Sequence, residues 1–251
     1  MSVNLPVSLV IPCHGRDKQT ADLLESLTAA NFRCEIIMVD DASPQSLEPI
    51  ARRFPSLSIT YLRNETNLGP AYSRNRGVEA ARWEIIAFTD NDCLVTPDWL
   101  SRLHESIIDS PASIAGIGGR TVASGTDLFS RYYDYHKILD PWYFRGKIHY
   151  VTTANAIFKR GPLEIVGGFD TSVRQAGGED PGLCFKLQNA GYGLGYNPDA
   201  VIRHQYARGL KAFMRTFERY GYGCAGQSAR HFKSQDFVQR RGFAALDVPE
   251  P

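Results

Sequence analysis

The sequence has few cysteines and no cysteine motif. Its five cysteines, at positions 13, 34, 93, 184 and 224, are scattered, and none stands in Cys-x-x-Cys spacing. This argues against a disulfide framework or a zinc site and favours reduced thiols. No apolar run approaches the roughly 18 residues that a membrane-spanning helix needs. The start of the chain also lacks the basic and apolar segments of a secretory signal, so we expect a cytoplasmic protein.

Two nucleotide-binding motifs are missing where they would matter. No Gly-x-Gly-x-x-Gly follows a predicted strand, and no Gly-Lys-Ser/Thr occurs. Neither a dinucleotide fingerprint nor a Walker loop can therefore support a nucleotide site here. No internal repeat or low-complexity tract is visible. The 251 residues, 43% hydrophobic and 22% charged, suit one large globular domain with a small appendage.

Positive charge gathers near the end of the chain. Between positions 202 and 241 nine Lys/Arg outnumber two acidic residues, a net charge of +7, and the rest of the chain carries −6. Phe213, Phe217 and Tyr220 recur there at helical spacing. We interpret residues 205–251 as a basic helical tail. It suits a helix docked on the domain, peripheral contact with the anionic inner face of a membrane, or an acidic partner, and the sequence leaves these open.

Apolar strands alternate with helices through the first half of the chain. The pattern predicts strands at 7–11, 35–39, 59–62, 85–88 and 114–118, and helices after an Asp17 N-cap, near 47–54, at 70–80 and at 99–108. Such alternation indicates an α/β fold whose mostly parallel sheet is covered by helices on both faces.

The second half is less regular. Residues 124–149 are rich in aromatic side chains and predict a long, partly mobile excursion. A strand at 151–158 follows. A helix containing Leu183, Leu187 and Ala190 is then expected to close at Gly191, before a last strand at 200–203.

Polar residues follow three of the predicted strands where each one ends. They are Cys13-His14-Gly15-Arg16, Asp40-Asp41 and Asp90-Asn91-Asp92. Ligands of such sheets collect beyond the carboxyl ends of the strands, so we expect a binding site there.

Asp90 and Asp92 stand two residues apart and can point to the same side. Carboxylate oxygens suit Mg²⁺ or Mn²⁺, ions that are usually held by one or two carboxylates together with a diphosphate. His204 follows the last strand and can complete a metal shell. Glu179 and Asp180 stand at a helix start, where they serve either as a general base or as an ordinary acidic first turn.

Six segments in order resemble family 2 glycosyltransferases of the GT-A fold. They are VSLVIPCHGR, IIMVDDAS, NLGPAYSRNRGVEAA, IIAFTDNDCLVTPDWL, TANAIFKRGPLEIVGGFD and GGEDPGLCFKLQNAGY. The likeness runs from about Val7 to His204. It implies a GT-A catalytic domain over 1–204, with a nucleotide-sugar-binding half (1–119) and an acceptor-side half (120–204), and a tail over 205–251.

The resemblance also implies roles for individual residues. Asp180 would be the general base beside Glu179, and Asp92, Asp90 and His204 would hold Mn²⁺ or Mg²⁺. The donor, a nucleotide sugar, would be bound by Pro12, Cys13, His14, Arg16, Asp40, Asp41, Asn67, Gly69, Arg74, Asn75, Asp90 and Asn91. Because like charges disfavour ionisation, we expect a raised pKa for Asp180.

Two departures from the family pattern have consequences. Pro12-Cys13-His14-Gly15 stands where the family usually has P-T-Y-N, which affects contacts to the base. The Q-x-x-R-W motif of polymerising members is absent, so we expect transfer of one sugar. The direct in-line displacement that the resemblance implies would invert the anomeric configuration. On the acceptor side Trp142, Tyr143 and Asn155 are candidates, because flat rings stack on sugars; these aromatic residues equally suit a cover for the sheet edge or core.

Competing functions remain open at this stage. A sugar-phosphate nucleotidyltransferase would use the same sheet and paired acids with attack at phosphorus, and a non-catalytic protein would bind nucleotide sugars without turnover. The resemblance favours a UDP-linked donor. The acceptor, whether a glycan, lipid-linked glycan, peptide or small metabolite, is not identified, and no nucleic-acid partner is expected.

Overall fold

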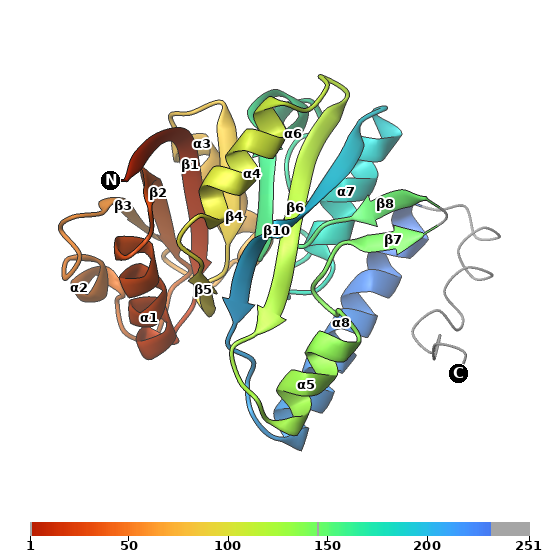
Figure 1. Ribbon diagram of the computed structural model, residues 1–251. Coiled ribbons are helices and arrows are strands. Elements are labelled where there is room, and N and C mark those ends of the chain that lie inside the picture. Colours follow the sequence, from red (N-terminus) through yellow and green to blue (C-terminus); the bar gives the residue numbers. More distant parts are fainter. Residues whose placement is uncertain (1, 145, 232–251) are drawn as a thin grey trace.

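The computed structural model describes residues 2–144 and 146–231. Within them an eight-stranded sheet forms the centre of the molecule, and a two-stranded hairpin lies beside it (Figure 1). The sheet strands are β1 (Val3–Cys13), β2 (Phe32–Asp40), β3 (Ser58–Arg63), β4 (Ile85–Thr89), β5 (Cys93–Val95), β6 (Ile114–Ala123), β9 (Asn155–Lys159) and β10 (Gly193–His204). The hairpin strands are β7 (Trp142–Phe144) and β8 (Lys147–Tyr150).

Helices cover both faces of the sheet. They are α1 (Asp17–Thr28), α2 (Glu48–Ala51), α3 (Pro70–Ala80), α4 (Trp99–Ile108), α5 (Leu128–Tyr135), α6 (Arg160–Ile165), α7 (Glu179–Asn189) and α8 (Leu210–His231). Leu23 of α1 and Trp99 of α4 belong to the apolar core on one face. Leu163 of α6 and Leu183 of α7 belong to the core on the other. The predicted α/β fold, with a mostly parallel sheet covered on both sides, is confirmed.

The strand order is β3-β2-β1-β4-β9-β6-β10-β5. Strands β1 to β4 are parallel, as are β6 and β10, whereas β9 and β5 pair antiparallel with their neighbours. The chain moves outward from β1 to β3 and returns to place β4 on the other side of β1. This switch point brings the ends of β1 and β4 together, and in such sheets a ligand site forms there.

Two short features near this edge differ from the prediction. Asp17 is the first residue of α1 and not its N-cap; the cap is Arg16, in a left-handed conformation with φ of 62° and no capping side chain. Strand β5 was not predicted, because three residues are too few to show a period.

The aromatic segment is built from regular elements and is not the irregular excursion that we expected. Asp127 caps α5 by accepting hydrogen bonds from the N–H groups of Phe129 (3.0 Å) and Ser130 (3.2 Å). The hairpin follows, and the next strand begins at Asn155, later than predicted. The last strand begins earlier, at Gly193.

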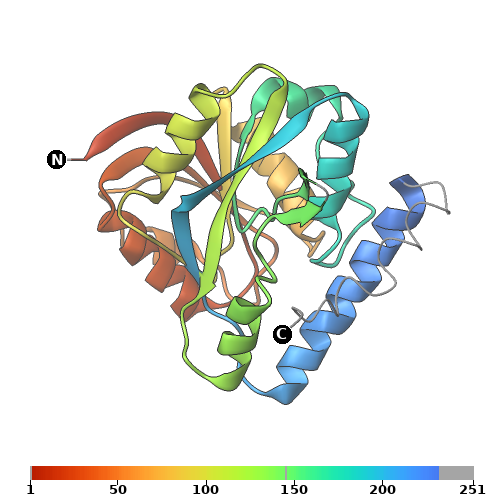
Figure 2. The same ribbon diagram turned by 45° about the vertical axis from the view of Figure 1, so that its right-hand side comes forward.

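Helix α8 lies along α5 and reaches the start of α7, as Figure 2 shows from a second side. Of the predicted tail, residues 232–251 lie outside the described part. Gly221 and Gly223, with Gly226, match the spacing of a dinucleotide fingerprint, but they lie within α8 and not in a turn between strand and helix. Among the described residues, no helix has the length and apolar character to cross a membrane.

Candidate active site

A cleft of about 1420 Å³ opens at the carboxyl edge of the sheet, between the strand ends and helices α5 and α8. Sixteen of the residues singled out from the sequence line it: Pro12, Cys13, His14, Arg16, Asp41, Asn67, Gly69, Arg74, Asp90, Asn91, Asp92, Trp142, Tyr143, Glu179, Asp180 and His204. They come from positions up to 192 residues apart and meet because parallel strands end at one edge.

Asp40 does not line the cleft, contrary to the sequence expectation. Its carboxylate is fully buried and accepts hydrogen bonds from the backbone N–H of Ser43 (2.8 Å) and from the Tyr61 hydroxyl (2.5 Å), and it pairs with Arg63. Burial alone would raise the pKa of Asp40, but the hydrogen bonds from Ser43 and Tyr61 hold it below the ordinary value. Asp40 therefore anchors the loop after β2.

Asn75 and Asn155 also serve the scaffold. Asn75 pairs with the backbone of Phe169 at both ends of its amide, at 2.9 and 2.8 Å. Asn155 accepts from the Trp99 indole at 2.7 Å and donates to the carbonyls of Arg120 and Ala200. Their amides are occupied internally, so neither side chain is placed to contact a ligand in the cleft.

Asp41 lines the cleft and holds the loop before α3. Its Oδ1 accepts from the Asn64 amide (2.7 Å) and from the Leu68 N–H (2.9 Å), and its Oδ2 accepts from the Gly69 N–H (2.8 Å). Gly69 has φ of 91° and stands at the start of α3, where a side chain would meet the backbone of Arg174. The carboxylate thus fixes the loop that approaches the cleft.

His14 completes this side. Its Nδ1 lies 2.8 Å from the Asp41 carbonyl and 3.1 Å from the Asn67 amide. Because a carbonyl can only accept, Nδ1 carries the proton in that hydrogen bond, which leaves Nε2 as an acceptor in the neutral ring.

Asp92 and His204 meet where the loop after β4 faces the end of β10. Asp92 Oδ1 lies 3.3 Å from His204 Nε2, yet it is buried and accepts no hydrogen bond. His204 Nδ1 is likewise buried without a hydrogen-bond partner. A carboxylate oxygen without a donor, beside an imidazole nitrogen that can offer its lone pair, fits a divalent cation. Arg16 pairs with the other oxygen, Oδ2, and its side chain is 43% exposed, so it has room to move aside for a ligand.

Cys93 lies within ligand distance of the same pair. Its thiol is fully buried in the core, and burial, followed by the negative charges of Asp92 and Asp90, raises its pKa well above the ordinary value. A protonated thiol is a poor ligand, and hard cations prefer oxygen. The donor set that fits Mn²⁺ or Mg²⁺ is therefore Asp92 with His204; Asp90 faces a different partner.

That partner is Arg74 of α3, which is buried among three carboxylates. Its guanidinium contacts Asp90 (2.8 Å), Glu179 (2.9 Å) and Asp180 (3.8 Å). Burial would lower the pKa of Arg74, but these carboxylates raise it above the ordinary value. The Arg74 guanidinium thus links the loop after β4 to the start of α7.

Asp180 is held at the cleft wall. Its Oδ1 accepts from the Thr153 hydroxyl at 2.6 Å and its Oδ2 from the Thr153 N–H at 3.2 Å. Burial, followed by the charge of Glu179, raises the pKa of Asp180 to about 7, against the lowering effects of Arg74 and Thr153. The direction agrees with the sequence expectation, although burial is the larger cause. A carboxylate of this kind accepts a proton near neutral pH.

Glu179 is almost completely buried, and its carboxylate is held by protein groups. Its Oε2 accepts from the N–H groups of Gly177 (2.7 Å) and Gly178 (2.9 Å), and its Oε1 accepts from Arg74. These contacts make it a positioning residue that fixes the first turn of α7, in which Asp180 stands.

Sequence reasoning missed two residues of the site. Thr153 holds the carboxylate of Asp180, and its only signal is its place in the TANA segment. Tyr206 lines the cleft with Trp142 and Tyr143, and so does Tyr220, which the sequence placed in the aromatic, basic tail. Tyr206 stacks at 3.8 Å between ring centres on Tyr133. No local pattern reveals residues that reach the site by folding back from the last strand and helix.

Comparison with known proteins follows this geometry. The model of glycosyl transferase family 2 matches residues 8–167, more than half of the chain. Pre-mycofactocin glycosyltransferase of Mycobacterium tuberculosis is 28% identical over 231 residues, which cover 90% of this chain and 48% of that protein. Glucosyl-dolichyl phosphate glucuronosyltransferase of Haloferax volcanii is 24% identical, over 80% of this chain and 69% of its own length. The chain thus spans about half the length of the first of these relatives.

Solved structures share the fold. A mannosyltransferase from Pyrobaculum calidifontis, in complex with GDP-Man and Mn²⁺, aligns with a TM-score of 0.68 at 21% identity, over 91% of this chain and 65% of that one. S. aureus TarS in complex with UDP-GlcNAc aligns with a TM-score of 0.63 at 16% identity, over 94% and 76%. The fold is therefore GT-A. Together with the family match across the strands that carry the acidic site, this places the chain in glycosyl transferase family 2.

Proposed function

We propose that the chain is an inverting, metal-dependent glycosyltransferase that moves one sugar from a UDP-linked donor to an acceptor hydroxyl. Family membership supports glycosyl transfer as the reaction class. The observation that carries the finer proposal is the carboxylate of Asp180, which faces the cleft with a pKa raised to about 7. A general base with a pKa near the working pH is well matched to deprotonating a hydroxyl.

The transfer step is a direct displacement. Asp180 accepts the proton of the acceptor hydroxyl while that oxygen attacks the anomeric carbon from the side opposite the nucleotide. The bond from this carbon to the phosphate oxygen breaks, and its electron pair leaves with the nucleoside diphosphate. Attack from the opposite side inverts the anomeric configuration. Arg74 holds Asp90 and Glu179 in place throughout.

The negative charge of the donor diphosphate would be compensated by a divalent cation held at the switch point. Asp92 and His204 would hold Mn²⁺ or Mg²⁺, which when bound acts as a Lewis acid toward the diphosphate. Solved GT-A neighbours contain Mn²⁺, which supports a divalent cation without choosing between Mn²⁺ and Mg²⁺. His14, Asn67 and Gly69 line the cleft, and in this proposal they bind the base and ribose of the donor.

The donor and acceptor are tested together. The neighbours were solved with GDP-Man, with UDP-GlcNAc, and with UDP and GalNAc, so both bases belong in the screen. We expect release of UDP from a UDP-sugar in the presence of Mn²⁺ or Mg²⁺ and of an acceptor molecule that carries a hydroxyl. The acceptors to screen are glycans, lipid-linked glycans, peptides and small metabolites. Release of pyrophosphate would instead indicate a nucleotidyltransferase. Binding without turnover of any donor would indicate a non-catalytic binding protein.

A further inference from the structure

Large apolar side chains are exposed at both ends of the short helix α5 and in the first turns of α8. Leu128 and Tyr135 of α5 are 76% and 68% exposed, and Leu210 and Met214 of α8 are 64% and 59% exposed. We call these four residues the apolar strip. The rings that the sequence offered for docking, Phe213 and its neighbours, do not contribute to it, because they pack inward between the two helices.

The apolar strip lies on one side of the helix pair. Both helices start at the same tip and rise from it side by side (Figures 1 and 2). The Tyr132 ring lies 5.1 Å from the Phe213 ring and 5.8 Å from the Phe217 ring, which fixes the facing surfaces. An α-helix has 3.6 residues per turn, so the residues of the apolar strip stand next to the ring contacts on each helix. On both helices they face the same side of the pair.

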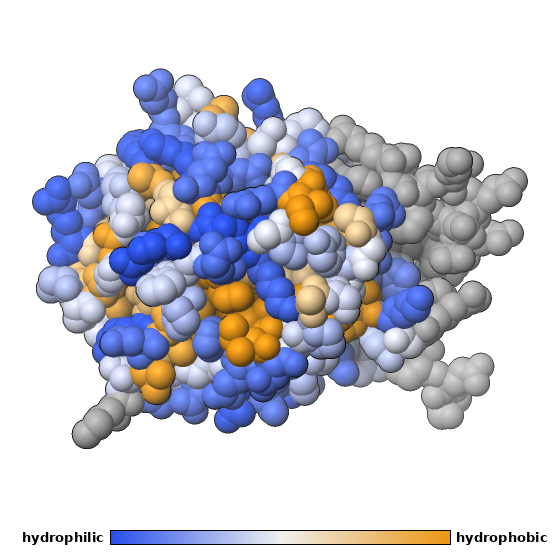
Figure 3. Space-filling model, turned by 90° about the horizontal axis from the view of Figure 1, so that it is seen from above, coloured by the Kyte–Doolittle hydropathy of each residue, from blue (hydrophilic) through white to orange (hydrophobic). Residues whose placement is uncertain are grey.

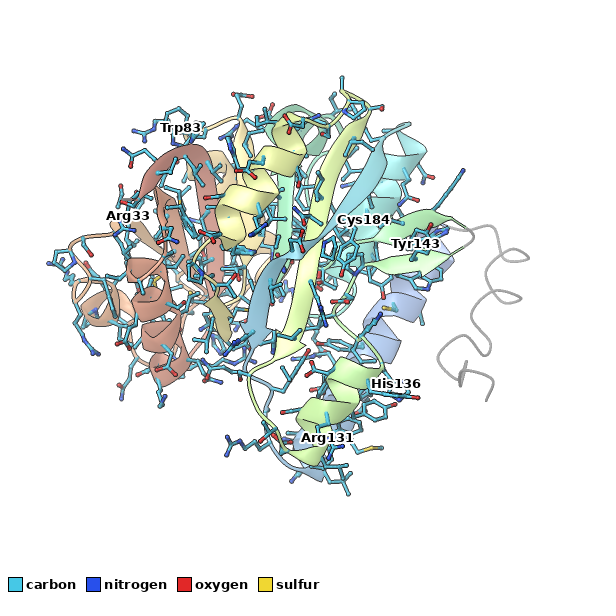
Figure 4. The ribbon with its side chains drawn as sticks, viewed as in Figure 1. Arg33, Trp83, Arg131, His136, Tyr143 and Cys184 are labelled. Carbon is cyan, nitrogen blue, oxygen red and sulfur yellow. The ribbon has the colours of Figure 1, made fainter. Side chains whose placement is uncertain are left out.

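Basic residues flank the apolar strip. Arg131 of α5 projects at the tip (Figure 4), and Lys211 and Arg215 are exposed on the outer side of α8, near Arg208. Among the acids nearby, Asp127 caps α5, and the exposed Asp134 accepts from the Ala123 N–H at 2.6 Å. Glu218 is exposed on α8, so the exposed basic residues of this region outnumber its exposed acids. Figure 3, from the opposite end, shows hydrophilic and hydrophobic side chains interspersed.

We infer that this tip docks the protein on an anionic lipid bilayer. Apolar side chains between basic ones suit a surface with an acyl interior and negative headgroups. A second copy of the chain is a poorer occupant, because a two-fold interface would set the same basic residues against one another. Tyr132 and Tyr135 also line the cleft, so a docked molecule presents its acceptor side to the bilayer.

The test is co-sedimentation of the full chain with vesicles, without substrate, so the result is independent of transfer activity. We expect binding to phosphatidylcholine vesicles containing one quarter phosphatidylglycerol. Binding to pure phosphatidylcholine, which has no net negative charge, should be at least tenfold weaker. Binding at 0.5 M salt should fall similarly, because the screening length, about 8 Å at physiological ionic strength, is shorter there.

Matched variants locate the surface. Leu128→Ser with Met214→Ser, and separately Lys211→Glu with Arg215→Glu, should each weaken binding to the anionic vesicles at least tenfold. The control is Ile108→Ser with Arg102→Glu on α4, an exposed apolar and basic pair away from the tip, which should bind like the unmodified protein. Circular dichroism confirms that each variant is folded.

Three results would overturn the inference. The first is no sedimentation with anionic vesicles at low salt. The second is wild-type binding by both folded tip variants. The third is a self-associated protein that becomes monomeric when Leu128 and Met214 are changed, because this surface would then serve a second copy.

Discussion

Arg74 holds three carboxylates of the cleft together. It is buried against Asp90, Glu179 and Asp180, which come from two distant segments. A buried cation with three acidic partners is stable only while those partners remain, since an unpaired buried charge is costly. The carboxylates have different tasks because Thr153 and the cleft surround Asp180, whereas backbone N–H groups surround Glu179.

At this scale we expect Asp180→Asn to abolish transfer. An amide keeps the shape of the side chain but cannot accept the acceptor proton, and general-base catalysis is typically worth about 10²- to 10⁴-fold. The rate of nucleoside diphosphate release should fall by that factor, while donor affinity, measured by titration calorimetry, stays unchanged. Wild-type transfer by this variant would remove Asp180 from the mechanism.

The rate should also depend on pH with an acidic limb. The pKa of Asp180 is raised to about 7, and only its ionised form can take a proton. We expect kcat/KM to rise tenfold per pH unit up to about pH 7 and then level off. Thr153→Val removes a hydroxyl donor that stabilises the ionised form, so it should move this limb to higher pH. A limb that does not move would show that another group titrates.

Asp92→Ala should eliminate the contribution of metal to donor binding. Asp92 and His204 are the lone-pair groups that fit a cation, and the alanine variant leaves one of them. In the presence of Mn²⁺ we expect this variant to bind UDP at least tenfold more weakly than the unmodified protein does. The affinity of the variant for UDP should be the same with and without Mn²⁺. Asp109→Ala, an exposed acid at the end of α4, is the control and should retain the Mn²⁺ dependence.

At the scale of elements, glycines bring α8 against the first turn of α7, which contains Asp180. The backbone of α8 at Gly223 approaches Gly177 and Gly178, whose N–H groups hold Glu179. A Cβ on Gly223 would lie 2.7 Å from the carbonyl carbon of Gly177, closer than such atoms come. The Cys224 thiol adds a hydrogen bond to the Gly177 carbonyl at 3.4 Å. The position of α8 therefore bears on the position of Asp180.

Two alanine substitutions in this helix separate its packing from its stability. Gly221 has nothing near the position of an added Cβ, so Gly221→Ala should stabilise the protein by about 1 kcal/mol through helix propensity and leave transfer unchanged. Gly223→Ala should instead push α8 from the catalytic turn and lower kcat/KM at least tenfold. Equal behaviour of the two variants in transfer assays would separate α8 from catalysis.

At the scale of the whole molecule, the buried carboxylate of Asp180 lowers the free energy of unfolding when it is ionised. A buried carboxyl whose pKa is raised in the folded state favours folding in its protonated form. That advantage is complete below pH 3.8, the ordinary pKa, and is lost as the pH rises to about 7. The folded protein without ligands therefore carries an unfavourable charge at Asp180 above neutral pH.

Asp180→Asn should therefore raise the free energy of unfolding at high pH. The variant removes that charge, so at pH 8 we expect it to exceed the unmodified protein by on the order of 2 kcal/mol. The gain should shrink as the pH falls from 7 to 4. Urea denaturation at several pH values measures this, and a pH-independent difference would contradict the raised pKa.

Local patterns predicted the sheet and its acidic rim. Apolar strands followed by Asp90, Asp92 or His14 are visible in the chain because burial and turn chemistry act over a few residues. Parallel strands end at one edge, so their polar ends were expected to meet, and sixteen predicted residues do line the cleft. Strand register, helix bounds near Arg16 and the short strand β5 depend on partners that are distant in sequence.

Folding in three dimensions assigned the tasks of these residues. Asp40 and Asp41 are adjacent in sequence, yet opposite orientation at the strand end sends one into the scaffold and leaves the other at the cleft. Thr153 entered the site because the segment before β9 packs against the start of α7, and Tyr206 and α8 because the chain after β10 folds back across the cleft. Composition and periodicity specify what each segment buries, whereas the contacts that set charge, pKa and accessibility arise between segments far apart and exist only once the chain has folded.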